Sequence, residues 1–215
     1  MEKKPSGTAG YHDNASHLAE QYESIRFEDV HRDVLHLFPD ELCDVLDIGA
    51  GSGRDAAALA LKGHSVVAVE PTEGLRNEGK KRHPLPNLEW VDDHLPGLSA
   101  TRKRNKGFGL ILLTAVWMHL TTDERRDAMQ ALSELLLPAG RIIMSLRHGP
   151  VPEGRQMFDV SAQETIDLAA RFGLMNRHVG KRQDMFDRSD VSWSLVVLEK
   201  IQAVDIRVHK HGKPA

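Results

Sequence analysis

The sequence predicts an α/β protein built on an open, doubly wound sheet with helices on both faces. Short apolar segments typical of strands alternate with helix-like segments through most of the chain. A glycine-rich turn follows the first of these strands, and the last two strand-like segments follow each other as a pair. Such an alternation is typical of a mostly parallel sheet whose crossover helices cover it.

The first half of the chain begins with helices and then alternates strand and helix. Apolar residues at helical spacing over residues 15–38 predict two helices. Residues 45–48 form a short apolar run that ends in glycines, as a buried parallel strand does. Segment 55–61 is rich in alanine and leucine, which favour helix. Residues 65–70 are the second expected strand, and residues 75–82 the helix after it.

Two capping signals locate helices in the second half of the chain. Thr121 and Glu124 have the spacing of a capping box, in which two side chains bond the free backbone amides of a helix start. The amphipathic helix that they begin is expected to run to Leu136. Ser161 and Glu164 repeat the pattern before a later helix. The remaining strands are expected over residues 88–91, 110–113, 141–146, 175–179 and 192–198.

Composition excludes several classes of protein. The chain has 31 acidic and 28 basic residues, a net charge of −3, which argues against a nucleic-acid partner because such proteins carry a basic excess. Its longest apolar stretch, residues 109–118, is shorter than the roughly 18 residues of a membrane span. Cys43 is the single cysteine, which excludes an internal disulfide and a multi-cysteine metal site. We therefore expect no metal and no membrane partner.

Length indicates one domain, since 215 residues lie near the roughly 100–200 that a domain usually has. We expect a flexible arm over residues 1–14, a single domain over residues 15–200 and a tail over residues 201–215. The polar N-terminus lacks the apolar stretch of a signal peptide, so we expect a cytoplasmic protein. The sequence leaves both a monomer and a homodimer open.

The most informative segment is residues 47–54, Asp-Ile-Gly-Ala-Gly-Ser-Gly-Arg, which contains the glycine-rich turn after the first strand. In an open α/β sheet a turn after the first strand borders the crevice where ligands bind, and glycines let a ligand approach the backbone. The dinucleotide fingerprint G-x-G-x-x-G requires a small third residue where this chain has Arg54. Here the third glycine, Gly53, comes one residue early, and Asp47 precedes the turn.

Acidic residues also end the next two strands. Glu70 follows Gly51 by 19 residues, where a carboxylate can accept hydrogen bonds from the hydroxyls of a ribose. Asp92 and Asp93 follow the third strand, where one residue of register decides which of them faces an adenine amino group. Three strands that end in acids favour a cationic, ribose-bearing ligand over one that carries a pyrophosphate.

On these motifs the sequence resembles the class I S-adenosylmethionine-dependent methyltransferases over roughly residues 20–200. It departs from the family pattern at Ala139, where glycine is usual, and at Gly109, where the family often has an aspartate. The resemblance implies a Rossmann-like sheet of seven strands whose last strand is antiparallel. It also implies S-adenosyl-L-methionine as cofactor and S-adenosyl-L-homocysteine as product. The matching segments are residues 47–53, Glu70, Asp92 or Asp93, residues 108–120 and residues 137–140.

The resemblance also implies a cofactor site, covered by the N-terminal helices of residues 15–38. Three of its side chains have two interpretations each. Arg26 pairs with the methionine carboxylate or is a solvated helix residue, Tyr22 contacts the cofactor or only the core, and Asp47 orients the cofactor ammonium group or the turn. The implied contacts are Tyr22, Arg26, Asp47, Gly49, Ala50, Gly51, Glu70, Pro71, Asp92, Asp93, Thr114 and Ala115.

Candidate catalytic residues follow the fourth and fifth strands. His119 lies near the point where the methyl group would emerge, and is either a general base or a packed histidine. Arg147 and His148 begin a long loop at the same sheet edge, and either bind an anionic acceptor or are exposed loop residues. The basic run 102–106 is either a solvated loop or a nucleic-acid contact.

The predicted activity is methyl transfer to a small-molecule acceptor by in-line displacement, without a metal or a covalent intermediate. Segment 113–116 lacks the Asn/Asp-Pro-Pro-aromatic run of enzymes that methylate exocyclic amines of nucleic acids, and Cys43 is not in the later loop that a cytosine-C5 enzyme needs. The alternatives are an RNA or protein methyltransferase, a non-catalytic S-adenosylmethionine-binding protein, and an NAD-dependent oxidoreductase, which the glycine spacing disfavours.

Overall fold

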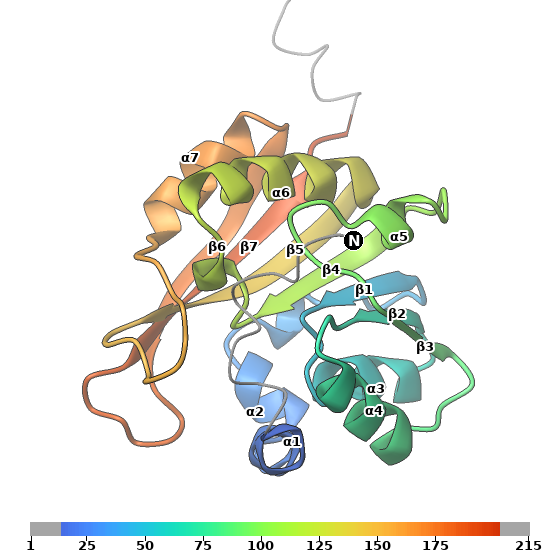
Figure 1. The fold of residues 1–215 in the computed structure, drawn as a ribbon. Coiled ribbons are helices and arrows are strands. Elements are labelled where there is room, and N and C mark those ends of the chain that lie inside the picture. The colour runs from blue at the N-terminus through green and yellow to red at the C-terminus, as the bar shows by residue number, and fades with distance from the viewer. Residues whose placement is uncertain (1–13, 203–215) are drawn as a thin grey trace, which may run out of the picture.

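A seven-stranded sheet forms the centre of the computed structural model, which describes residues 14–202 (Figure 1). The strand order is β3-β2-β1-β4-β5-β7-β6. The first five strands are parallel, and β7 is antiparallel to both of its neighbours. The predicted seven-stranded Rossmann-like sheet with an antiparallel last strand is therefore confirmed. The strands are β1 Asp44–Ile48, β2 Ser65–Val69, β3 Leu88–Val91, β4 Phe108–Thr114, β5 Leu136–His148, β6 Leu174–Gln183 and β7 Ser192–Lys200.

Helices cover both faces of the sheet. Figure 1 shows α6 and α7 on one face and α1 to α4 on the other. The α-helices are α1 Ala15–Glu23, α2 Phe27–His31, α3 Arg54–Leu61, α4 Glu73–Arg82, α5 Ser99–Arg102, α6 Thr122–Leu135 and α7 Ala162–Ala170. Among residues 14–202, the short 3₁₀ helices are η2 Leu35–Leu37 and η3 Trp117–His119.

Alternation along β1 divides the core between the two faces. Leu46 and Ile48 pack into the cluster that contains residues of α6 and α7, whereas Val45 packs into the cluster that contains residues of α2 and α3. Because successive side chains of a strand point to opposite faces, Asp47 points to the same face as Val45. The strand therefore places one buried carboxylate between the sheet and α3.

The capping signals are borne out at both predicted helix starts. Thr121 accepts a hydrogen bond from the backbone of Glu124, and the Glu124 carboxylate accepts one from the backbone of Thr121 at 2.8 Å, which completes the capping box of α6. At the start of α7, Ser161 Oγ accepts from the backbone N of Glu164 at 3.1 Å. These bonds satisfy backbone amides that the first turn of a helix leaves without a partner.

The structure differs from the prediction at β5, which begins at Leu136 rather than near residue 141. The pairing of β5 with β4 shifts register between Phe108 and Leu110. The residues just before 141, which were expected to precede the strand, therefore form an irregular first part of β5. Ala139 has a positive φ of 60° there, at the position where the family usually has glycine.

The predicted arm over residues 1–14 and tail over residues 201–215 lie almost wholly outside the described residues. Within residues 14–202, no helix is long and apolar enough to cross a membrane. The same residues contain no group of three or more His, Cys, Asp or Glu side chains that could hold a metal ion.

Candidate functional site

One cavity of about 470 Å³ lies at the carboxyl ends of the parallel strands, under α1. Its lining begins at the turn after β1, continues along the ends of β2 and β4, and reaches the ends of β5, β6 and β7. This volume is within the range of small-molecule sites. The predicted residues that line it are Tyr22, Asp47, Gly49, Ala50, Gly51, Glu70, Pro71, Asp93, Thr114, Ala115, His119 and Arg147.

The turn after β1 brings bare backbone to the cavity. Gly49 and Gly51 have φ values of +68° and +58°, a conformation that side chains other than glycine rarely adopt. A Cβ at Gly49 would lie 2.5 Å from Val116 Cγ2, so there is no room for one. The backbone N of Gly51 donates to Glu70 Oε2 at 2.9 Å, which ties the turn to the end of β2.

Glu70 is buried at the end of β2 and supports the turn. Its second oxygen, Oε1, accepts from the backbone N of Thr72 at 2.8 Å. Burial raises the pKa of Glu70, although the backbone hydrogen bonds from Thr72 and Gly51 oppose that rise. A carboxylate offers about four lone-pair sites, so these two bonds leave Glu70 able to accept from ligand hydroxyls.

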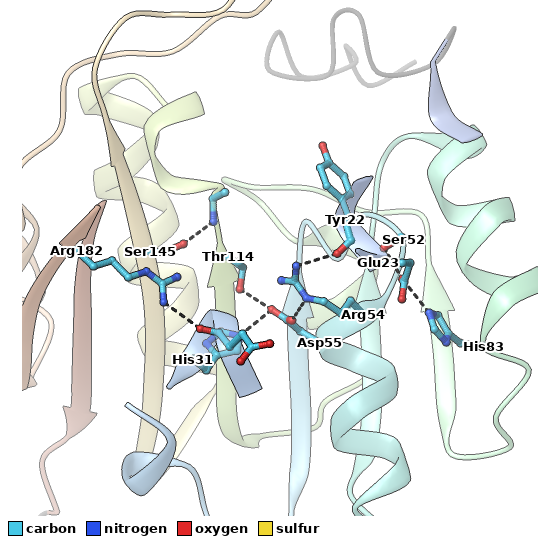
Figure 2. Close-up of polar contacts among 12 residues, drawn as sticks. Tyr22, Glu23, His31, Ser52, Arg54, Asp55, His83, Thr114, Ser145 and Arg182 are labelled. Carbon is cyan, nitrogen blue, oxygen red and sulfur yellow. Dashed lines mark hydrogen bonds and ion pairs between the residues drawn. The ribbon is translucent and has the colours of Figure 1, made fainter. Parts of the chain in front are cut away.

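A buried polar network lies directly beneath the turn and centres on Asp55 in α3 (Figure 2). Asp55 Oδ2 is 2.9 Å from His31 Nε2 and accepts from Thr114 Oγ1 at 2.8 Å, while Oδ1 accepts from Arg54 Nε at 2.7 Å. Burial alone would raise the pKa of Asp55, but the charges and hydrogen bonds of His31 and Arg54 hold it well below its usual value. The network joins α2, α3 and β4 under the cavity.

Asp47 keeps a carboxylate oxygen that no described residue bonds. It is 2% exposed, and its Oδ2 has no hydrogen-bond partner among the described residues. Burial, together with the negative charge of Asp55, raises its pKa well above the usual value. A buried, partly unsatisfied carboxyl group beside a ligand cavity suits a cationic hydrogen-bond donor.

Contacts from α1 hold that helix over the turn. Arg54 Nη1 donates to the backbone oxygen of Tyr22 at 3.2 Å (Figure 2). Glu23 Oε1 accepts from Ser52 Oγ at 2.7 Å and lies 3.0 Å from His83 Nε2. The Tyr22 ring lies 3.3 Å from the point where a Gly51 Cβ would be. Burial, with the nearby Glu70 charge, raises the pKa of Tyr22 to about 12, so its hydroxyl stays neutral.

The far end of the cavity holds His119 and Arg147. His119 Nδ1 is 2.7 Å from the backbone oxygen of Gln156. Burial lowers the pKa of His119 and the positive charge of Arg147 lowers it further, while the Gln156 carbonyl opposes the fall. Arg147 Nη1 donates to the backbone oxygen of Pro150 at 2.8 Å. This end therefore combines a neutral imidazole at pH 7 with a buried guanidinium.

Three predicted site residues do not line the cavity. The side chain of Arg26 is 76% exposed and pairs with Asp29, so the solvated interpretation holds for it. The side chain of Asp92 is 67% exposed and pairs with Arg76. His148 Nε2 is 2.8 Å from Ser194 Oγ, and His148 lines a separate small cavity.

Asp93, by contrast, lines the cavity, but both of its oxygens have protein donors. Oδ1 accepts from the backbone N of His94 at 2.9 Å. Oδ2 accepts from the backbone N and the hydroxyl of Thr101 at 2.7 and 2.8 Å. Its carboxylate therefore organises the loop that forms this wall of the cavity.

Four lining or supporting residues are absent from the sequence prediction: His31, Arg54, Asp55 and Arg182. Arg54 and Asp55 directly follow the glycine turn, so their place in the chain is a signal that could have identified them. His31 and Arg182 come from distant segments, and nothing in their local sequence marks them.

Comparison with known proteins gives a family match. The model of a methyltransferase domain matches residues 45–140. An uncharacterized methyltransferase of Oceanobacillus iheyensis is 27% identical over 168 residues, which cover 76% of this chain and 70% of that protein. One from Alkaliphilus oremlandii is 29% identical over 100 residues, 46% of this chain and 44% of that protein. The chain thus spans less than half the length of the second relative.

Solved structures share the fold at low sequence identity. A TehB-like S-adenosylmethionine-dependent methyltransferase of Corynebacterium glutamicum has a TM-score of 0.66 and 20% identity, covering 88% of this chain and 99% of that one. The 1,6-didemethyltoxoflavin-N1-methyltransferase of Burkholderia thailandensis, solved with that compound and S-adenosylhomocysteine, has a TM-score of 0.64 and 20% identity, covering 90% and 92%.

The matched domain and the named relatives show that residues 45–140 are similar to a methyltransferase domain. The fold of the described residues is shared with S-adenosylmethionine-dependent methyltransferases of known structure.

Proposed function

We propose that this chain transfers a methyl group from S-adenosylmethionine to a small-molecule acceptor. The observation that carries the proposal is the continuity of the cavity, which runs from Glu70 and the glycine turn to His119 and Arg147. Carboxylates predominate at the end near Glu70, and cations predominate at the end near Arg147. A donor and an acceptor could therefore lie side by side in a single cavity.

The residues at the glycine turn fit the cofactor. Asp47 Oδ2, buried and without a partner among the described residues, would accept from the ammonium group. Glu70 would accept from the ribose hydroxyls, and the backbone of Gly49 and Gly51, which lines the cavity, would lie against the cofactor. When bound, the cofactor would supply an electrophilic methyl group, whose carbon an aligned nucleophile attacks in line while the sulfonium sulfur leaves as a neutral thioether.

His119 would act as the general base for an acceptor that must lose a proton. Because a carbonyl oxygen only accepts, Nδ1 carries the ring proton in its contact with Gln156, and Nε2 of the neutral ring is the basic nitrogen. The lowered pKa keeps the ring neutral at pH 7. Nε2 would take the acceptor proton as the methyl group is transferred.

Tyr22 would position the cofactor and exclude water from it. Its helix is held over the turn by the Arg54 and Ser52 contacts, and its ring lies against Gly51. A reaction that neutralises the sulfonium charge proceeds better in a site from which water is excluded.

Calorimetric titration of the purified protein with S-adenosylmethionine, S-adenosylhomocysteine and NAD tests the cofactor half of the proposal. We expect micromolar binding of the first two and none of NAD. Incubation with methyl-labelled S-adenosylmethionine and separate pools of metabolites, RNA and protein tests the acceptor half. Label in the metabolite pool supports a small-molecule acceptor, and label confined to RNA or protein overturns it.

A further inference from the structure

Strand pairing places three large side chains in a row along one wall of the cavity. Trp193 in β7 is paired directly with Arg147 in β5 and with Arg182 in β6. Directly paired residues of antiparallel strands project from the same face of a sheet. All three residues line the cavity. Two guanidinium groups thus flank an indole ring on one wall.

The charges of this wall do not balance. Asp184 Oδ1 and Oδ2 accept from Arg188 at 2.7 and 2.8 Å, and Oδ1 also accepts from Trp193 Nε1 at 2.9 Å. Its carboxylate is therefore matched by Arg188. Among the described residues, no carboxylate lies within 4.0 Å of a nitrogen of Arg147, which donates to the backbone oxygens of Gly149 and Pro150 and to the thioether of Met157.

Arg182 is only weakly compensated. Its Nη1 donates to the backbone oxygen of Asp29 at 3.3 Å and lies 3.8 Å from the carboxylate of Asp33. Its side chain is 9% exposed, and its Nε has no partner among the described residues. Burial lowers the pKa of Arg182, although the charge of Asp33 opposes the fall.

Buried guanidinium groups are costly unless an anion lies near them. The cavity beside this row also has an apolar part, formed by Met157, Met185 and Phe186. A ligand that matched both features would place an anionic group against the arginines and an apolar, planar body against Trp193 and these side chains.

We infer that the methyl acceptor of the proposed function is a planar, apolar molecule with a carboxylate or phosphate group, which Arg147 and Arg182 bind on either side of Trp193. The inference rests on the proposed function, since it names the class of acceptor that the same cavity would hold. Guanidinium groups pair with carboxylate and phosphate oxygens through two parallel hydrogen bonds, which would also fix the orientation of the acceptor.

Binding of matched probes tests the inference without knowledge of the natural acceptor. The probes are 2-naphthoate, 2-naphthyl phosphate and the neutral 2-naphthamide, titrated into protein saturated with S-adenosylhomocysteine. We expect each anion to bind wild type about tenfold or more tightly than the amide. The stronger of the two anions identifies carboxylate or phosphate as the preferred group. Equal affinity for all three probes, or no detectable binding of either anion, overturns the inference.

The variants Arg147→Gln and Arg182→Gln test the two arginines separately, with Arg126→Gln on the exposed face of α6 as the matched control. We expect each cavity variant to lose about tenfold in anion affinity and to keep its affinity for the amide and for S-adenosylhomocysteine. An equal loss in Arg126→Gln, or unchanged anion affinity in both cavity variants, overturns the inference. Failure of wild type to bind S-adenosylhomocysteine instead contradicts the proposed function.

Discussion

The two ends of the cavity are built in different ways. At the proposed cofactor end, carboxylates predominate, and some of their partners lie in or next to the turn that follows β1, as in the bonds from Gly51 to Glu70 and from Arg54 to Asp55. At the proposed acceptor end, cations predominate, and side chains from β5, β6 and β7 meet only through strand pairing.

The difference indicates which residues of the proposed site are needed for the fold and which are available to bind a substrate. Glu70 and Asp55 each bond backbone or buried side chains, so the cofactor end is also part of the structure's support. Arg147 and Arg182 bond mainly backbone oxygens, so little of the fold depends on their charge. We therefore expect substitutions at the first end to alter stability and cofactor binding, and those at the second to alter turnover or acceptor binding.

The largest effect is expected from Asp55→Ala, which leaves His31 and Arg54 without their buried carboxylate partner. We expect the free energy of unfolding to fall by about 3–5 kcal/mol, measured by chemical denaturation. The control, Asp123→Ala at a site 89% exposed, should change it by less than about 0.5 kcal/mol. A similarly small change in Asp55→Ala would mean that the network does not support the cofactor end.

Acid adds a second signature of the same network. Because the pKa of Asp55 is lowered in the folded state, its stabilising contribution is present above its unfolded value, about 3.9, and is lost as the pH falls further. As the pH falls below about 4, the free energy of unfolding of Asp55→Ala should therefore decrease less than that of wild type.

His119→Gln tests the acceptor end and is expected to lower kcat by about 10²-fold, a typical value for loss of a general base. Its stability and its affinity for S-adenosylhomocysteine should stay near wild type. In wild type, kcat/KM should rise with pH to a plateau and have its midpoint below 6.5, since burial and Arg147 lower the pKa of His119. An unchanged pH profile in the variant would exclude the general-base role.

Glu70→Ala tests the cofactor end by binding rather than by stability. We expect the binding free energy of S-adenosylhomocysteine to weaken by about 1–3 kcal/mol, because ribose hydroxyls would lose their acceptor. Glu89→Ala, a surface glutamate paired with Arg104, is the control and should bind normally. Calorimetry that finds equal affinity in both variants would exclude the ribose assignment.

The smallest effect is expected from Asp47→Asn. Because the folded state raises the pKa of Asp47, the wild-type protein loses stability as the pH rises above the unfolded value of about 3.9. The variant should be more stable by about 0.5–1 kcal/mol at pH 7, and the difference should disappear in acid. Its affinity for the cofactor should fall, which would mark Asp47 as a residue kept for binding. Higher affinity would contradict that role.

Much of the fold and of the cofactor end could be predicted from the sequence. Residues 45–70 contain a buried strand, a glycine turn, a helix and a second strand that ends in an acid, and all of these are continuous in the chain. Local geometry then forces Glu70 to lie beside the turn, since neighbouring parallel strands end at the same edge. The capping bonds of Thr121 and Ser161 are equally local, which is why both helix starts were predictable.

Only the tertiary structure decided which of the candidate side chains line the cavity. That outcome depends on side-chain direction and on contacts between distant segments. One residue of register after β3 buries Asp93 and exposes Asp92. Arg26, just before α2, forms an ion pair with Asp29 of that helix, whereas Arg182 lines the cavity from β6. The sequence by itself therefore determined the layers and the cofactor turn of this protein. The pairing of β5, β7 and β6 decided its acceptor wall, since only that pairing brings residues from three separate strands onto one face.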